Sequence, residues 1–153
     1  LPGGGLPLRL ISNGSLLHRT EVQRGIAQLG ACGGEVWFKL DRASPAGVRA
    51  VNGVRQRPER ALEALSLCAT LAPTWVQTCY FALDGALPSC EEQRAYLTAL
   101  SSVRDKIKGV HLYGVARPSM QPGAARLTAA PLSELERFAV EIAALGLRVT
   151  VSA

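Results

Sequence analysis

The apolar residues of this chain follow two periods in alternation. Short apolar runs of strand length recur, and most are followed by a longer segment in which apolar residues return every three or four positions. Side chains alternate faces along a strand and repeat every 3.6 residues along a helix, so the two patterns predict different elements. The predicted strands cover residues 8–12, 35–41, 74–83, 110–116 and 147–151. The predicted helices cover residues 15–29, 58–71, 89–103 and 131–145.

Turn and capping residues mark the ends of several of these segments. Asn13-Gly14 is a strong turn pair directly after the first strand, and Gly30 and Gly146 each follow a helical pattern. Pro58 suits the first turn of a helix. Two stretches are expected to be irregular, residues 44–53 and 119–130.

The resulting order is βαβαβαβαβ, which is typical of an α/β protein with a parallel sheet and right-handed crossovers. A closed eight-stranded barrel takes about 250 residues, so five strands in a chain of 153 residues predict an open sheet or part of a TIM-like barrel. The Gly- and Pro-rich residues 1–7 are interpreted as a linker, and residues 8–153 as one domain.

The strand over residues 35–41 ends in two opposite charges. Trp37, Lys39 and Asp41 fall on one side of it. Two interpretations stay open from the residues alone: a surface ion pair, worth about 0–1 kcal/mol, or a polar ligand site. The ends of other strands also carry polar residues, namely Asn13, Asp84 and Arg117. Loops after the carboxyl ends of parallel strands form the sites of such folds, which favours the ligand interpretation.

Composition narrows the classes of function. The formal net charge is +5 and the hydrophobic fraction is 48%, which fits a folded globular domain. An RNA-binding module is disfavoured because the arginines are dispersed and aromatic residues make up only 5%. No apolar run approaches the roughly 18 residues of a membrane span, and no signal peptide is evident, so we expect a cytoplasmic protein without membrane contact. The chain begins at Leu1 rather than Met, which predicts a processed or partial product.

The cysteine and histidine positions match no common catalytic or metal motif. The spacing of the cysteines fits neither CxxC nor a zinc knuckle, so we expect reduced thiols. Cys68 is predicted to be in the core, whereas the roles of Cys79 and Cys90 stay open. His18 is expected at the surface. His111 lies on a predicted buried strand, which favours a hydrogen-bonded core histidine over a catalytic one.

Four segments in order resemble the later strands of radical S-adenosylmethionine (SAM) enzymes, a superfamily with a partial (β/α)6 barrel. They are Ile11-Ser12-Asn13-Gly14-Ser15-Leu16-Leu17, Phe38-Lys39-Leu40-Asp41, Val76-Gln77-Thr78 and Leu112-Tyr113-Gly114-Val115-Ala116-Arg117-Pro118. The order and spacing of these segments agree with that superfamily across roughly residues 8–151, nearly the whole chain. It implies an iron–sulfur oxidoreductase that uses SAM and a [4Fe-4S] cluster, with a substrate that is a peptide, an RNA or a small metabolite.

The resemblance also implies roles for individual residues. Lys39 would meet the methionine carboxylate of SAM, and Asp41 its ammonium group or a ribose hydroxyl. Arg117 would hold an anionic group of the substrate. The residues assigned to the cofactor site are Ser12, Asn13, Lys39, Asp41, Gln77 and Tyr113.

Two hallmarks of that superfamily are absent from the sequence, the CxxxCxxC motif that binds the cluster and the GGEP strand end. We therefore expect a fragment of a longer protein that is inactive alone. Its first strand, residues 8–12, would be an exposed apolar edge that favours self-association. A non-catalytic α/β domain that binds a nucleotide or a phosphorylated metabolite at the same strand ends is the alternative.

Overall fold

A computed structural model describes residues 6–53, 57–115 and 124–153 of the chain. Within these residues, the main sheet has five parallel strands in the order β1-β2-β3-β5-β7. The strands are β1 (Arg9–Ser12), β2 (Glu35–Lys39), β3 (Thr74–Cys79), β5 (Gly109–Tyr113) and β7 (Val149–Ser152). The predicted α/β fold with a parallel sheet is confirmed.

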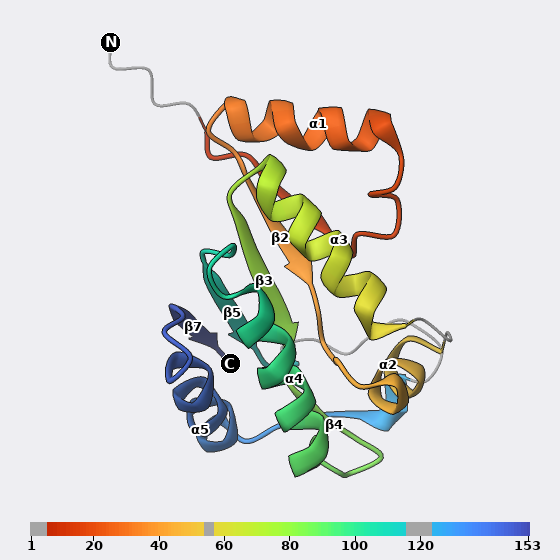
Figure 1. The fold of residues 1–153 in the computed structure, drawn as a ribbon. Helices are drawn as coiled ribbons and strands as arrows, with labels where there is room; N and C mark the ends of the chain where they lie inside the picture. Colours follow the sequence, from red (N-terminus) through yellow and green to blue (C-terminus); the bar gives the residue numbers. More distant parts are fainter. Residues whose placement is uncertain (1–5, 54–56, 116–123) are drawn as a thin grey trace.

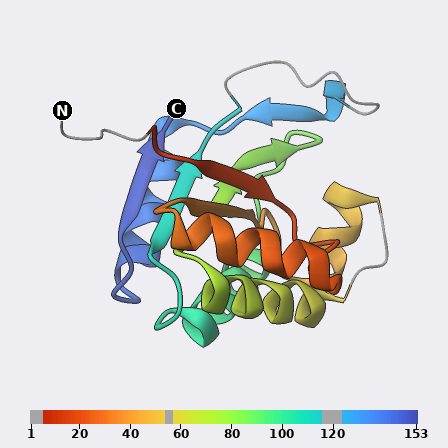
Figure 2. The same cartoon turned by 90° about the horizontal axis from the view of Figure 1, so that it is seen from above.

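The longer helices lie on one side of this sheet (Figures 1 and 2). They are α1 (Thr20–Ala31), α3 (Pro58–Leu71), α4 (Cys90–Val103) and α5 (Leu132–Ala143). Strands that follow one another in sequence order, joined by crossovers of a single hand, place every connecting helix on the same face. This is the arrangement of a TIM-like barrel that has been left open.

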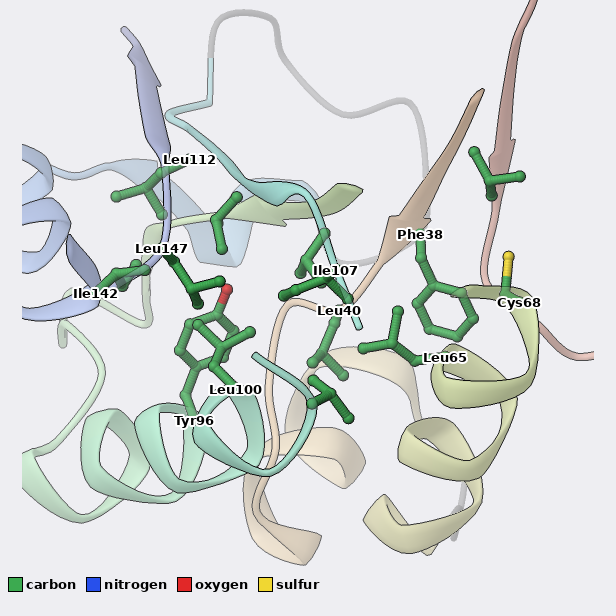
Figure 3. Close-up of a cluster of buried hydrophobic side chains, with 14 of the residues drawn as sticks. Phe38, Leu40, Leu65, Cys68, Tyr96, Leu100, Ile107, Leu112, Ile142 and Leu147 are labelled. Carbon is green, nitrogen blue, oxygen red and sulfur yellow. The ribbon is translucent and has the colours of Figure 1, made fainter. Parts of the chain in front are cut away.

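The core fills the space between the sheet and these helices (Figure 3). Val36 and Phe38 of β2 are fully buried and belong to one cluster with Leu65 of α3 and Leu100 of α4. Burying such a side chain stabilises the fold by about 1.5–3 kcal/mol. Cys68 belongs to the same cluster, as the sequence predicted.

The other side of the sheet, here called the open face, carries half-buried side chains. Successive residues of a strand point to opposite faces, and the pairing of the strands places these residues side by side. The open face consists of Trp37, Lys39, Trp75, Gln77, His111 and Tyr113. The prediction that Trp37 and Lys39 share one side of their strand therefore holds.

Several predicted elements begin, end or divide elsewhere in the structure. The helix predicted from residue 15 begins at Thr20, because backbone turns from Gly14 to Leu17 and from Leu16 to Arg19 come first. The strand predicted over residues 74–83 is two strands. β3 ends at Cys79, and β4 (Phe81–Leu83) pairs antiparallel with β6 (Leu127–Ala129) in a separate ribbon.

Residues 44–53, which were predicted to be irregular, contain helix α2 (Pro45–Asn52). Ser44 caps this helix by accepting a hydrogen bond from the Gly47 amide, and Gly53 ends it in a left-handed conformation. The predicted loop over residues 119–130 includes β6 and a short 3-10 turn, Ala124–Arg126. Among the described residues, no helix has the length and apolar character needed to span a membrane.

Candidate functional site

Three polar side chains meet at the carboxyl ends of β2 and β5. Lys39 donates a hydrogen bond from Nζ to the Tyr113 hydroxyl over 3.1 Å. The same ammonium lies 3.8 Å from Oδ2 of Asp41. The side chain of Lys39 is 39% exposed and that of Asp41 17% exposed. The ion pair between Lys39 and Asp41 therefore exists. It lies at the carboxyl end of the sheet, here called the strand mouth, and is partly exposed to solvent.

The Asp41 side chain also binds a backbone amide of the neighbouring strand. β2 ends at Lys39, and the carboxylate that follows accepts a hydrogen bond from the Cys79 amide, with 2.9 Å between N and Oδ1. Cys79 is the last residue of β3. One oxygen of Asp41 thus holds the ends of two neighbouring strands together, while the other lies toward Lys39.

The electrostatics of this cluster keep Lys39 charged. Burial alone lowers the pKa of Lys39, but the Asp41 carboxylate and the Tyr113 hydroxyl outweigh it and leave the pKa above its ordinary value. Burial raises the pKa of the Tyr113 hydroxyl. Burial also raises the pKa of the Cys79 thiol to about 11. The site therefore presents an ammonium cation beside neutral hydroxyl and thiol groups.

Gln77 lies in register between Lys39 and His111. Its side chain is half-buried on the open face. Gln77 is therefore the neighbour of Lys39 across the sheet, and its contact with a ligand stays a prediction.

Ser12 and Asn13 form hydrogen bonds within the turn that follows β1, and the polar partners of Lys39 in the described residues are Tyr113 and Asp41 instead. The Ser12 hydroxyl accepts from the Gly14 amide, and the Asn13 side chain accepts from the Ser15 amide. Ser12 pairs with the buried Phe38, which puts its side chain on the helix-covered face. Arg117, the predicted substrate ligand, lies outside the described residues.

A stack of rings forms the floor of the open face below this mouth. The His111 ring lies 4.4 Å from the Trp37 ring and 4.5 Å from the Trp75 ring, measured between centroids. Arg9 covers the Trp37 ring at 5.0 Å. Gly109 makes the stack possible, because a Cβ atom there would lie 2.5 Å from Cζ3 of Trp75.

The role predicted for His111 is only partly correct. Its Nδ1 is 2.6 Å from the Thr150 hydroxyl, but Nε2 is buried with no partner among the described residues. Burial lowers the pKa of His111. Sequence reasoning missed the stack, because the pairing register that brings Trp37 and Trp75 side by side is not encoded in either strand alone.

Arg42 connects the mouth to the β4–β6 ribbon, and this residue was also missed. Its guanidinium donates to the backbone oxygens of Asp41 and Phe81 over 3.1 and 3.4 Å, and lies 4.7 Å from the Phe81 ring centroid. Asp84, predicted as a strand-end polar residue, is instead in the turn of that ribbon, where it forms an ion pair with Arg126. Arg42 directly follows Asp41 in the sequence, and this position could have indicated that it lies near the site.

A shallow groove of about 440 Å³ lies between α3 and α4, away from the open face. Its lining combines apolar side chains such as Leu62, Ala95 and Ala99 with the charged side chains of Glu59, Glu91 and Arg94. None of the predicted site residues borders it. The described residues also contain no group of three His, Cys, Asp or Glu side chains that could hold a metal ion.

No family model matches the chain, and neither does any curated protein. Its fold is similar to the crystal structure of a domain of pyruvate-formate lyase-activating enzyme from Bacteroides vulgatus, with a TM-score of 0.68 and 12% identity. That likeness covers 97% of this chain and 83% of the other. A radical SAM methyltransferase from Sphaerobacter thermophilus is similar with a TM-score of 0.61 and 12% identity, over 94% of this chain and 39% of that one. At such identities the likeness shows the fold alone, and it confirms the predicted partial-barrel fold.

Proposed function

We propose that this chain is part of a radical SAM enzyme and that its strand mouth binds SAM beside the substrate. The observation that carries this proposal is the cluster of Lys39, Asp41 and Tyr113 at the carboxyl ends of β2 and β5. The position of this cluster at the carboxyl ends of parallel strands supports the proposal, because α/β proteins commonly bind ligands there. The likeness to a radical SAM methyltransferase supports the choice of ligand.

The donor set fits the amino-acid end of SAM. The Lys39 ammonium is the cation that would hold the carboxylate, and it is exposed enough to exchange Asp41 for a ligand. Oδ2 of Asp41 would accept from the ligand ammonium or a ribose hydroxyl while Oδ1 keeps its bond to the Cys79 amide. Gln77 would contact the ribose or the substrate, and Tyr113 would orient Lys39.

The residues do not fit a [4Fe-4S] cluster. All four cysteines lie among the described residues, and they are free and spread over the fold, with Cys68 buried in the core. The cluster would have to be bound by protein outside these residues. We therefore assign this chain a part in holding SAM and positioning it, and we expect the chain alone not to cleave it.

The test is calorimetric titration of the chain with SAM and with 5′-methylthioadenosine, which keeps adenine and ribose but lacks the carboxylate and ammonium. Lys39→Met removes the cation and keeps most of the side-chain stem. We expect it to weaken SAM binding by about tenfold or more, because hydrogen bonds to charged groups are among the stronger ones. Binding of 5′-methylthioadenosine should change little.

Lys108→Met is the matched control, since Lys108 is exposed directly before β5, at the amino end of the sheet. It should leave both affinities unchanged. If the chain binds ATP or a phosphorylated sugar but not SAM, the domain is a nucleotide or phosphometabolite binder. If Lys39→Met weakens the binding of SAM and of 5′-methylthioadenosine equally, Lys39 does not bind the carboxylate.

A further inference from the structure

We infer that Glu92 of α4 is a positioning residue for the strand mouth, because its hydrogen bond with Ser44 fixes the segment from Asp41 to Ser44. This segment follows β2 and ends at the N-cap of α2. It begins with Asp41, whose carboxylate lies beside Lys39 at the mouth. This role of Glu92 rests on the proposed function, since Asp41 is assigned there to the binding of SAM.

The Glu92 side chain binds another element instead of capping its own helix. Ser89 is the N-cap residue of α4 and accepts a hydrogen bond from the Glu92 amide, so the two residues have the spacing of a capping box. In that motif the glutamate side chain reaches back to the amide of the N-cap residue. Here Oε1 of Glu92 accepts from the Ser44 hydroxyl, 48 positions away in sequence. Its Oε2 is buried without a partner among the described residues.

The Ser44 hydroxyl links this carboxylate to the first turn of α2. It donates to Glu92 and accepts from the Gly47 amide, with 2.9 Å between N and Oγ. A negative charge is favourable at the amino end of a helix, where the free amides carry partial positive charge. Gly47 makes the approach possible, because a Cβ atom there would lie 2.6 Å from Cδ of Glu92. Glu92 therefore lies directly against α2.

Arg42, in the middle of the segment, lies in the field of the same carboxylate. Burial lowers the pKa of the Arg42 guanidinium, and the carboxylates of Asp41 and Glu92 oppose this effect. The guanidinium also donates to the carbonyls of Asp41 and Phe81. The negative charge of Glu92 therefore favours the position in which Arg42 meets β4.

A second residue of α4 fixes the chain just before the segment. The Thr78 hydroxyl donates to the Leu40 carbonyl over 2.9 Å, so Tyr96 is the donor in its own hydrogen bond with Thr78. Both side chains are buried. Tyr96 and Glu92 are four residues apart and lie on the same face of the helix. α4 therefore holds the chain on both sides of Asp41.

The test combines amide hydrogen exchange with calorimetric titration of SAM, both on the whole chain. Glu92→Ala removes the acceptor of the Ser44 hydroxyl. The Cys79 amide, which donates to Asp41, should then exchange about tenfold faster, and SAM should bind about tenfold more weakly. The Val110 amide, which is hydrogen-bonded at the amino end of β5, should change much less. Equal acceleration of both amides would mean that Glu92 stabilises the whole fold, and would overturn the inference.

Two further variants separate the bond to Ser44 from a loss of charge. Glu91→Ala is the matched control, since Glu91 is exposed in the same turn of α4 and carries the same charge. It should leave the exchange rates and the SAM affinity nearly unchanged. Glu92→Gln keeps an oxygen that can accept from Ser44, so it should restore most of the SAM affinity and the slow exchange at Cys79. Equal effects of Glu92→Gln and Glu92→Ala would overturn the role of this bond.

Gly47→Ala tests the same contact from the side of α2. Its Cβ atom would displace the Glu92 carboxylate, so this variant should also speed exchange at Cys79. Combined with Glu92→Ala it should add nothing, because the space beside residue 47 is then free. Effects that add would contradict the contact between Glu92 and Gly47.

The exchange measurement also separates this role of Glu92 from the proposed function. If the unchanged chain does not bind SAM, the proposed function fails, and exchange at Cys79 alone decides whether Glu92 holds Asp41 in place. If SAM binds, but Glu92→Ala leaves both its affinity and the exchange at Cys79 unchanged, Glu92 positions nothing and the proposed function stands.

Discussion

Lys39 and Tyr113 are joined by a hydrogen bond of 3.1 Å although β3 lies between the strands that carry them. The bond crosses the carboxyl end of the sheet above Gln77 and Cys79. It requires both long side chains to lean toward the same point on the open face. The mouth is therefore built from three adjacent strands rather than from β2 alone.

Removing the hydroxyl of Tyr113 should lower the pKa of Lys39. Burial lowers this pKa, and Tyr113→Phe deletes one of the groups that raise it, the largest of which is the Asp41 carboxylate. The free energy of unfolding should fall by only about 0.5 kcal/mol, at the low end for a hydrogen bond, since Lys39 is partly solvated. NMR titration of the Lys39 side chain measures the pKa, and urea unfolding measures the stability. Tyr80→Phe removes a hydroxyl that does not touch Lys39 and should leave its pKa in place.

Two replacements of Asp41 should separate its structural role from its charge. Asp41→Asn keeps an oxygen that can accept from the Cys79 amide, so the free energy of unfolding should change little. The loss of charge should still lower the pKa of Lys39 and weaken SAM binding. Asp41→Ala leaves the Cys79 amide without its acceptor and should cost about 1–3 kcal/mol. Equal stabilities of the two variants, measured in urea, would argue against the bond to Cys79.

The sequence predicted the strands of the main sheet because each combines a short apolar run with a turn signal. For β2, alternation also predicted that Trp37 and Lys39 share one face. Helix α2 was missed because its eight residues are too few to display a clear 3.6-residue period, although Ser44, Pro45 and Gly53 are good capping residues. Short helices depend more on their caps than on an apolar stripe.

The side-chain contacts between neighbouring strands could not be predicted from the sequence. His111 meets Trp37 and Trp75 only because β5 follows β3 in the sheet, with a particular register. A single strand contains no information on that register, and a shift by one residue would move every side chain to the other face. The ribbon of β4 and β6 was missed for the same reason, since its two strands lie more than 40 residues apart.

The stability of the fold should depend on pH through His111. Burial holds the pKa of His111 below its ordinary value of 6.5, so the unfolded chain takes up a proton first as the pH falls. This contribution is complete above pH 6.5 and is lost as the pH falls below it toward the folded pKa. Urea unfolding at pH 7 and at pH 5 should show the loss.

His111→Phe should remove this part of the pH dependence, because the phenyl ring keeps its place between the indoles but does not titrate. Thr150→Val is the companion variant, since it deletes the partner of Nδ1 and keeps the imidazole. It should retain the pH dependence. A slope between pH 5 and pH 7 that is the same in His111→Phe and the unchanged chain would assign it to other groups.

Two glycine-to-alanine replacements should change stability in opposite directions. Gly14 has a φ of +74°, and a Cβ atom there would lie 2.6 Å from Cε2 of the buried Phe38. Gly14→Ala should therefore destabilise the fold by about 1–3 kcal/mol, from backbone strain and the displaced ring. Gly25 lies in the exposed part of α1, where an added Cβ meets nothing within 4 Å. Gly25→Ala should stabilise the fold by about 0.5–1 kcal/mol, because alanine loses less freedom in a helix. Urea unfolding of both variants measures these changes. An unchanged free energy of unfolding in Gly14→Ala would mean that the turn after β1 does not pack on Phe38, and that the first strand is held by its pairing with β2 alone.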